Sequence, residues 1–144
     1  MEKLFSTDGI TGTAITELTC ELIMQTGRAL VLSLSKKLKH RLTVFVGRDT
    51  RISSEVLENA LVAGLCSAGA DVVKLGVLPS AAVAYLTKSR NADAGVMISA
   101  SHQSYEMNGL KIFSGAGYKI SEDIEDEIEK AVLLHPETIL IKSH

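Results

Sequence analysis

Short apolar runs alternate with longer segments of helical periodicity along most of this chain. The apolar runs predict strands at residues 42–46, 71–75, 95–98 and 110–113. The periodic segments predict helices from 16 to about 39, from 53 or 54 to 69, over 79–87, and from 121 until Pro136. Because crossovers place helices on both faces of such a sheet, the pattern predicts a three-layer α/β/α domain. Its sheet should be mixed, mostly parallel, and built from about four strands.

Individual residues predict where these helices begin and end. Thr16 is placed to cap the first helix, and Ser53 or Ser54 to cap the second, because a hydroxyl can accept a hydrogen bond from a free N–H of the first turn. Gly69 is placed to end the second helix in a left-handed conformation. Ser121 is expected to cap the last helix, with acidic residues in the favourable first turn.

The first helix repeats its leucines at steps of four residues or multiples of four, which places much of its apolar surface on one side. These leucines are Leu18, Leu22, Leu30, Leu34 and Leu38. Gly27 interrupts the helix and indicates close packing against a neighbouring element. Cys20 and Cys66 lie in apolar helix faces without metal-ligand spacing, so we expect both to be reduced core residues.

Composition narrows the class of protein. The chain has 144 residues, 46% of them hydrophobic, and a formal net charge of -2. We expect one domain over residues 1–134, followed by a tail at 135–144. No strongly basic face is indicated, which argues against a nucleic-acid partner. The basic run at residues 36–41 falls where the first helix should end, where cations complement the helix dipole.

The chain shows neither an apolar run of membrane-spanning length nor a signal-peptide pattern at its start. We therefore expect a cytoplasmic protein without a membrane partner.

Three polar segments should meet at one edge of the sheet. They are residues 6–13, 47–51 and 99–108. Binding sites in such sheets gather outside the carboxyl ends of the strands. The first segment is rich in glycine and hydroxyl residues, so it could be an anion-binding loop or an ordinary turn. The Ser-Ala-Ser-His run at 99–102 could present a nucleophilic hydroxyl or serve only as a polar connection.

Four segments, taken in order, resemble the motifs of one enzyme family. They are Ser6-Thr-Asp-Gly-Ile-Thr-Gly12, Gly47-Arg-Asp-Thr-Arg51, Leu78-Pro-Ser-Ala-Ala-Val-Ala-Tyr-Leu86, and Ile98-Ser-Ala-Ser-His102 followed by Asn108-Gly-Leu-Lys111. Together they resemble the first domain of the phosphohexose mutases, the phosphoglucomutase and phosphomannomutase family. The Ser-Ala-Ser-His form is most similar to the glucosamine branch. The similarity extends from about Leu4 to Val132.

The resemblance implies a phosphoryl exchange between glucosamine 6-phosphate and glucosamine 1-phosphate by way of a phosphoserine. Ser101 matches that phosphoserine, whose phosphate would also contact the metal. His102 matches its neighbour in the family's active site, and Lys111 matches the proposed general acid/base.

Further residues match the loops that border the family's site. Asp8, Arg48 and Asp49 match residues of the phosphate- and substrate-binding loops. The implied cofactor is Mg²⁺, and the implied partner is a hexosamine phosphate.

The sequence departs from the family pattern within the motifs. Thr11 stands where the family has arginine, so a cation near the phosphate is missing. Gln103-Ser104 replaces Asn-Pro after the histidine, which removes a fixed φ angle from the loop. Ser6 replaces glycine, and Ser80-Ala81 replaces Thr-Pro.

The family builds its active site from four domains, and three of its loops do not occur in this sequence. These are the Asp-x-Asp-x-Asp metal loop, the Gly-Glu-x-Ser-Gly sugar loop and the Arg-x-Ser-Gly-Thr phosphate loop. Mg²⁺ takes about six oxygen ligands, so its protein ligands would come mainly from a domain that this sequence lacks. We therefore expect little or no mutase turnover from the 144-residue chain alone.

Two functional hypotheses remain open from the sequence. The first is the phosphoserine domain of a mutase, which would associate with the missing mutase domains. The second is a truncated, non-catalytic paralogue that binds a partner or itself through the exposed interdomain face. A generic nucleotide-binding domain is disfavoured, because the sequence has neither a Gly-x-Gly-x-x-Gly turn nor a P-loop.

Overall fold

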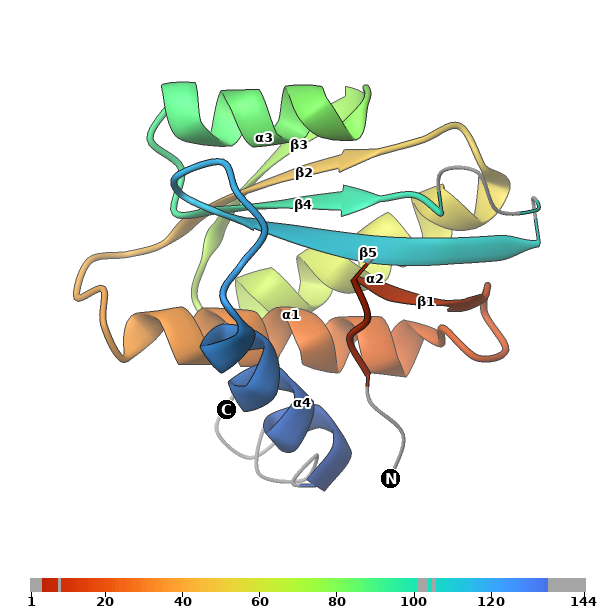
Figure 1. Cartoon of the computed structure of the whole chain (residues 1–144), viewed down its shortest axis with the longest axis horizontal. Coiled ribbons are helices and arrows are strands. Elements are labelled where there is room, and N and C mark those ends of the chain that lie inside the picture. Colours follow the sequence, from red (N-terminus) through yellow and green to blue (C-terminus); the bar gives the residue numbers. More distant parts are fainter. Residues whose placement is uncertain (1–3, 8, 101–103, 105, 135–144) are drawn as a thin grey trace.

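The computed structural model describes residues 4–7, 9–100, 104 and 106–134, and this part of the chain contains one five-stranded sheet (Figure 1). In sequence order its strands are β1 (Ile10–Thr13), β2 (Thr43–Arg48), β3 (Asp71–Val77), β4 (Ala94–Ile98) and β5 (Met107–Ser114). Across the sheet they follow the order β1-β5-β4-β2-β3. β3, β2 and β4 are parallel, whereas β5 is antiparallel to both β4 and β1. The expected mixed α/β sheet is confirmed, with five strands instead of about four.

The extra strand is β1, which lies inside the segment expected to be a loop. Its pairing with β5 joins Ile10 to Leu110 and Thr13 to Met107. Ile10 is buried in the core, which anchors this edge strand despite its glycine and threonine content.

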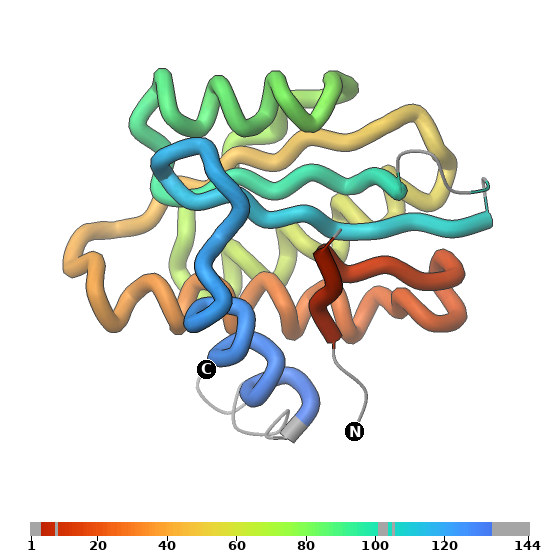
Figure 2. Tube along the Cα trace, viewed as in Figure 1, coloured from red at the N-terminus to blue at the C-terminus, as the bar shows by residue number. Residues whose placement is uncertain are grey.

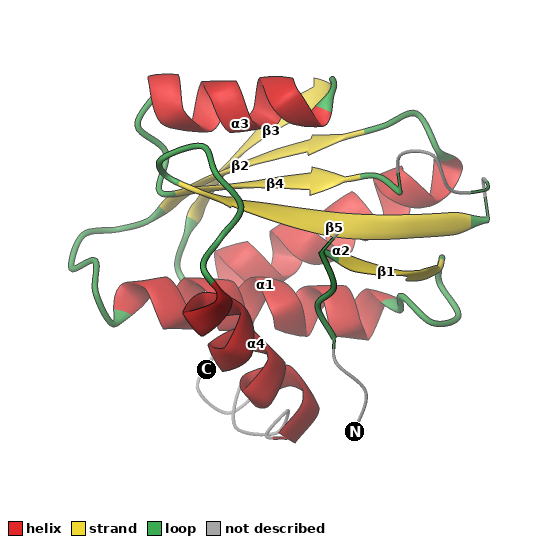
Figure 3. Cartoon of the chain, viewed as in Figure 1, coloured by secondary structure: helices red, strands yellow, loops and turns green. Residues whose placement is uncertain are grey.

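Four helices in the described residues complete the layers (Figure 3). α1 (Cys20–Ser35) and α2 (Ile52–Ser67) cover one face of the sheet, and α3 (Ser80–Ser89) covers the other. α4 (Glu122–Leu134) packs against α1. The three-layer architecture is therefore as expected. In the described part of the chain, the layer on the second face of the sheet consists of α3.

The first described residues and α4 lie on the same side of the sheet (Figure 2). They are joined by Glu129, whose Oε2 accepts hydrogen bonds from the N–H groups of Leu4 and Phe5 at 2.6 and 3.2 Å. Phe5 is buried in the same core as Ile124, Ile128 and Val132, the apolar side of α4 expected from its periodicity.

α1 and α2 cross closely because each has a glycine at the contact. A Cβ atom on Gly64 would lie 2.1 Å from the carbonyl oxygen of Met24, and one on Gly27 would lie 3.1 Å from that of Leu61. The prediction of close packing at Gly27 is confirmed. The main core fills the space between these helices and the sheet, and a smaller cluster of Val83, Met97 and Phe113 lies under α3.

Two expected N-caps are wrong. α1 is capped by Thr19, whose hydroxyl accepts from the Leu22 N–H at 3.0 Å, because residues 13–18 form a turn before the helix instead of its first turn. α2 begins at Ile52 with Arg51 as its N-cap. The hydroxyls of Ser53 and Ser54 bond to side chains outside the helix instead of capping it.

The other two helix boundaries are confirmed. Gly69 follows α2 with a φ of +103°, and its N–H bonds to Cys66 O at 3.0 Å while the next N–H bonds to Leu65 O at 3.1 Å. The Ser121 hydroxyl accepts from the Ile124 N–H at 3.3 Å at the start of α4.

The two cysteines differ in their surroundings. Cys20 is half-buried against the core, whereas Cys66 is exposed, so its assignment to the core was wrong. Cys66 lies one position after the buried Leu65 and thus on the outer side of α2. No helix in the described residues has the length and apolar character needed to cross a membrane.

Candidate functional site

The loops that follow β2 and β4 meet at one edge of the sheet. The Asp49 N–H bonds to Ile98 O at 3.1 Å, and the Ser99 N–H bonds to Gly109 O at 3.0 Å. A Cβ atom on Gly109 would lie 2.8 Å from Ile10 O and 3.1 Å from Ser99 O. The predicted convergence of the three polar segments is therefore confirmed for the residues that the structure describes.

The first segment reaches this edge as a tight turn followed by β1. Ser6 and Gly9 exchange backbone hydrogen bonds of 2.8 and 3.1 Å, so both of these N–H groups are engaged within the turn. Gly9 has a φ of +86°, and a Cβ atom there would lie 2.2 Å from Leu110 O. These contacts favour the turn over an anion-binding loop at Ser6 and Gly9.

Asp49 is held by its own loop and by α2. Its carboxylate accepts from the Arg51 N–H at 3.1 Å, from Arg51 Nη1 at 3.0 Å, and from the Ser54 hydroxyl in a short hydrogen bond. Both carboxylate oxygens are therefore committed to protein donors. This arrangement suits a residue that orients the loop.

Asn108 links that loop to β5. Its fully buried side chain donates from Nδ2 to Ser53 Oγ at 2.8 Å and to Ser54 Oγ at 2.9 Å. Its Oδ1 accepts from the Gly109 N–H at 2.8 Å. The path Asn108–Ser54–Asp49 is thus a continuous chain of hydrogen bonds between two of the sequence motifs.

The side chain of Arg48 contacts α2 and the backbone of its own loop. Its Nε lies 3.5 Å from Glu58 Oε1, and its Nη1 donates to Asp49 O at 3.2 Å. Lys74 Nζ lies 3.6 Å from the same oxygen of Glu58, whose side chain is 4% exposed. Glu58 Oε2 and Arg48 Nε have no hydrogen-bond partner among the described residues. The guanidinium therefore neutralises a buried carboxylate beneath the edge of the sheet.

Lys111 lies on the opposite face of the sheet from Arg48. It is half-buried in β5 and pairs in register with Met97 of β4. Met97 packs with Val83 of α3, so Lys111 shares the α3 face, while Arg48 contacts α2 on the other. The structure thus places Asp49 at the rim but does not bring Arg48 and Lys111 together.

Ser101, His102 and Asp8 lie outside the described residues. The flanks of the segment that carries Ser101 are described: Ala100 is buried, and the Met107 N–H bonds to Ser104 O at 3.0 Å. Both flanks are therefore anchored to the sheet and its adjoining turn.

An open pocket of about 560 Å³ lies at this edge, between the ends of β2 and β4 and the start of α3. Asp49, Thr50, Ser80 and Ser99 line its polar side. Thr50, Ser80 and Ser99 were not among the site residues predicted from the sequence. The usable signal was their position within two residues of a strand's end, for Thr50 and Ser99, or at the first residue of a helix, for Ser80.

The described residues contain no group of three or more His, Cys, Asp or Glu side chains that could hold a metal ion. Asp49, whose loop meets the end of β4, already accepts from three protein donors. These residues therefore do not form a Mg²⁺ site by themselves.

Residues 2–137 match the family model described as phosphoglucomutase/phosphomannomutase, alpha/beta/alpha domain I. The chain belongs to this family. The sequence is 52% identical over 139 residues to a phosphoglucosamine mutase of Acetivibrio thermocellus, and 52% identical over 132 residues to one of Ruminiclostridium cellulolyticum. These alignments cover 96% and 92% of this chain but only 31% and 29% of the two relatives. The resemblance to the phosphohexose mutases is thereby confirmed.

Solved structures of the phosphohexose mutase family share the fold of this domain. A protein from Thermus thermophilus described as a phosphomannomutase superposes with a TM-score of 0.80 at 27% identity, over 89% of this chain and 29% of its own. A phosphoglucomutase/phosphomannomutase family protein from Burkholderia thailandensis gives 0.76 at 26% identity, over 90% of this chain and 30% of its own. The chain therefore corresponds to under a third of each of these mutases.

Proposed function

We propose that this chain is the phosphoserine-bearing domain of a phosphoglucosamine mutase-like enzyme that interconverts glucosamine 6-phosphate and glucosamine 1-phosphate in the cytoplasm. The observation that carries the proposal is the convergence of the family's motif segments at one sheet edge in a chain 52% identical to phosphoglucosamine mutases. Strand ends position such loops rigidly, which is what phosphoryl transfer requires of a protein.

In this proposal Ser101 carries the phosphoryl group. A sugar hydroxyl attacks the phosphorus, the bond from phosphorus to Ser101 Oγ breaks, and a new P–O bond to the sugar forms. The hydroxyl proton leaves to a base, and the Ser101 oxygen takes up a proton. The resulting sugar bisphosphate then returns its other phosphoryl group to Ser101, which loses its proton to the base, and the isomeric monophosphate is released with the phosphoserine restored. Lys111 is the proposed acid/base and His102 the proposed neighbour of the phosphate, while Asp8, Arg48 and Asp49 belong to the bordering loops.

The local contacts suggest how these roles are divided. Arg48 is paired with Glu58, and Asp49 accepts hydrogen bonds from Arg51 and Ser54. In this proposal the two residues therefore shape the loop and contribute to the electrostatic potential of the site, instead of binding the sugar directly. Thr50, Ser80 and Ser99 offer hydroxyls along the open pocket and are the proposed polar contacts for a sugar phosphate.

We further propose that the 144-residue chain alone has little or no turnover. Mg²⁺ would neutralise phosphate charge in a complete site, and the described residues do not supply its ligands. The test is an assay of the purified chain with glucosamine 6-phosphate, a hexose 1,6-bisphosphate primer and Mg²⁺, beside a complete phosphoglucosamine mutase as positive control. Product formation by the chain at a rate comparable with the control would refute this part of the proposal.

A second candidate function is self-association, which the exposed edge of the sheet favours. β3 is one of the two edge strands of the described sheet, and Val73 and Val77 on it are 44% and 54% exposed. An unpaired apolar edge is a template for pairing with another chain. Light scattering for the oligomeric state and intact mass spectrometry for the phosphate together distinguish the candidates: a stable dimer whose chains carry no phosphate favours self-association, and a phosphorylated monomer favours the mutase domain.

A further inference from the structure

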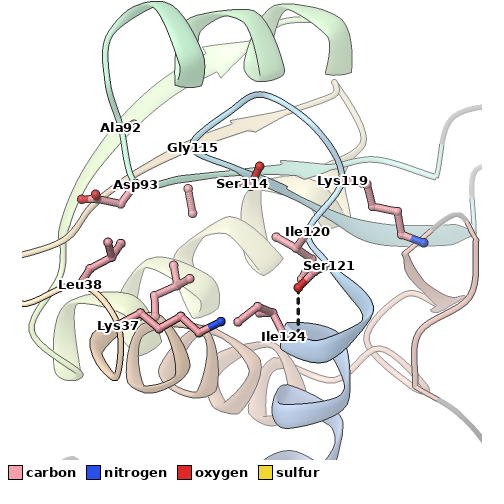
Figure 4. Close-up of a pocket in the computed structure, with 12 residues that line it drawn as sticks. Lys37, Leu38, Ala92, Asp93, Ser114, Gly115, Lys119, Ile120, Ser121 and Ile124 are labelled. Carbon is pink, nitrogen blue, oxygen red and sulfur yellow. Dashed lines mark hydrogen bonds between the residues drawn. The ribbon is translucent and has the colours of Figure 1, made fainter.

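A second pocket lies at the other end of the sheet and is unrelated to the motif segments. Its volume is about 550 Å³, and it lies between the end of α1, the start of β4, the turn after β5 and the first turn of α4 (Figure 4). We call it the α1–α4 pocket. Asp93 and Ala94 reach it at the amino end of β4, whereas Ser99 of the candidate site follows the carboxyl end of the same strand.

The floor of the α1–α4 pocket is apolar. Leu34 and Leu38 come from α1 and the turn after it, and Ala94 comes from β4. Ile120 comes from the segment before α4, and Ile124 from the first turn of that helix. Protein interiors are close-packed, so a hollow of this size over apolar side chains is not needed for stability. Small-molecule sites have this character: a volume of about 300–1,000 Å³, mostly apolar walls and a few polar groups.

The polar groups at the rim favour an anion. In Figure 4 the amine of Lys37 points towards Ile124 at the mouth of the pocket, whereas the Lys119 amine is directed away from the other lining residues. Lys119 Nζ is already paired with Glu125 Oε2 at 3.5 Å. In the part of the chain that the structure describes, no ion pair within 4 Å involves Lys37.

The nearby carboxylates are occupied by other donors. Asp93 Oδ1 lies 2.7 Å from His40 Nε2, and its Oδ2 accepts from the Thr43 N–H at 2.8 Å. Glu127 accepts from the Ser33 hydroxyl and lies 3.6 Å from Lys36 Nζ. Lys37 is near enough to Glu127 to contribute a small lowering of its pKa, after the larger effect of Ser33. Lys37 is therefore the cation best placed to meet a ligand.

We propose that the α1–α4 pocket binds a small amphipathic carboxylate. The apolar part of the ligand lies on Leu38 and Ile124, and its carboxylate meets the Lys37 amine at the mouth. The hydroxyls of Ser114 and Ser121, which line the same pocket, accept local N–H groups and retain the capacity to donate.

The probe for this site is octanoate, with octanol as the uncharged ligand of matched length. Both are titrated into the ¹⁵N-labelled 144-residue chain, and amide shifts are followed by NMR. We expect octanoate to shift residues 34–38, 92–94 and 114–124. Lys37→Met keeps the length of the side chain but removes its charge. It should weaken octanoate binding about fivefold, the size of a partly exposed charge pair, and leave octanol binding unchanged.

The matched control is Lys39→Met, because Lys39 lies outside the pocket and bonds to Lys36 O at 3.0 Å. It should leave both affinities unchanged. The proposal is overturned if octanoate shifts no residue of the pocket, if its shifts cluster elsewhere, or if Lys37→Met binds it as tightly as the parent chain. It is also overturned if the same residues shift with protein concentration alone, since a second copy would then occupy the pocket.

Discussion

The buried amide of Asn108 donates a hydrogen bond of 2.9 Å to the hydroxyl of Ser54, and Ser54 in turn donates to the carboxylate of Asp49. Asp49 and Ser54 come from the loop after β2 and the start of α2, and Asn108 of β5 lies 54 residues after Ser54. The chain of bonds therefore fixes two of the family's motif segments relative to one another. It also explains why Ser54 does not cap α2: its hydroxyl is used between elements.

Asn108→Ala should destabilise the domain by about 2 kcal/mol, because it removes the donor to the buried hydroxyl of Ser54 and the half-buried one of Ser53, and leaves the buried Gly109 N–H without its acceptor. Urea denaturation followed by circular dichroism measures the loss. Asn59→Ala is the matched control, since Asn59 is exposed on α2, and it should change stability by less than about 0.5 kcal/mol. Equal effects of the two substitutions would show that the Asn108 bonds contribute nothing.

The two glycines at the contact between α1 and α2 should differ in how well they tolerate a larger side chain. Gly64→Ala places a Cβ atom 2.1 Å from Met24 O, whereas Gly27→Ala places one 3.1 Å from Leu61 O. Backbone atoms cannot yield cheaply, so Gly64→Ala should cost about 3 kcal/mol and Gly27→Ala about 1 kcal/mol. Thermal unfolding of both variants tests this ranking, and a more stable Gly64→Ala protein would contradict the close crossing of α1 and α2.

A pH dependence is expected at the contact between α1 and α4. The hydrogen bond from Ser33, aided by Lys36, lowers the pKa of Glu127 below its ordinary value. A depressed folded-state pKa gives stability that is present above the unfolded value of about 4.3 and is lost as the pH falls through the folded value.

Glu127→Gln should therefore reduce the loss of stability between about pH 5 and pH 3, by less than about 1 kcal/mol because the side chain is 39% exposed. Asp126→Asn is the control, since Asp126 is exposed on the same helix. Denaturation midpoints across this pH range give the comparison, and an unchanged slope in Glu127→Gln would rule out the linkage.

The local sequence pattern was sufficient to predict most of the helices and strands of the fold. The apolar runs at β2, β3, β4 and β5 are dense in β-prone residues, and Gly69 and Ser121 act within one or two turns of their own helices. β1 was missed because Ile10–Thr13 is short, and it is a strand through its pairing with β5, about a hundred residues later in the chain.

The candidate site was less accessible from sequence. Its converging segments follow from the rule that parallel strands end at one edge, and this was predictable. The direction of Arg48 was not, because it depends on Glu58 and Lys74, which the fold brings beneath β2. The roles of Ser54 and Asn108 were also invisible, since their hydrogen bonds join positions 54 residues apart.

Phosphosite mapping by mass spectrometry, on the chain purified from its own cells, tests most directly whether Ser101 carries the transferred phosphoryl group. We predict one phosphoryl group on Ser101, none on the neighbouring Ser99 or Ser104, and none at all in Ser101→Ala. Phosphate on one of the neighbouring serines, or a chain that is never phosphorylated, would contradict the claim that Ser101 carries the transferred group.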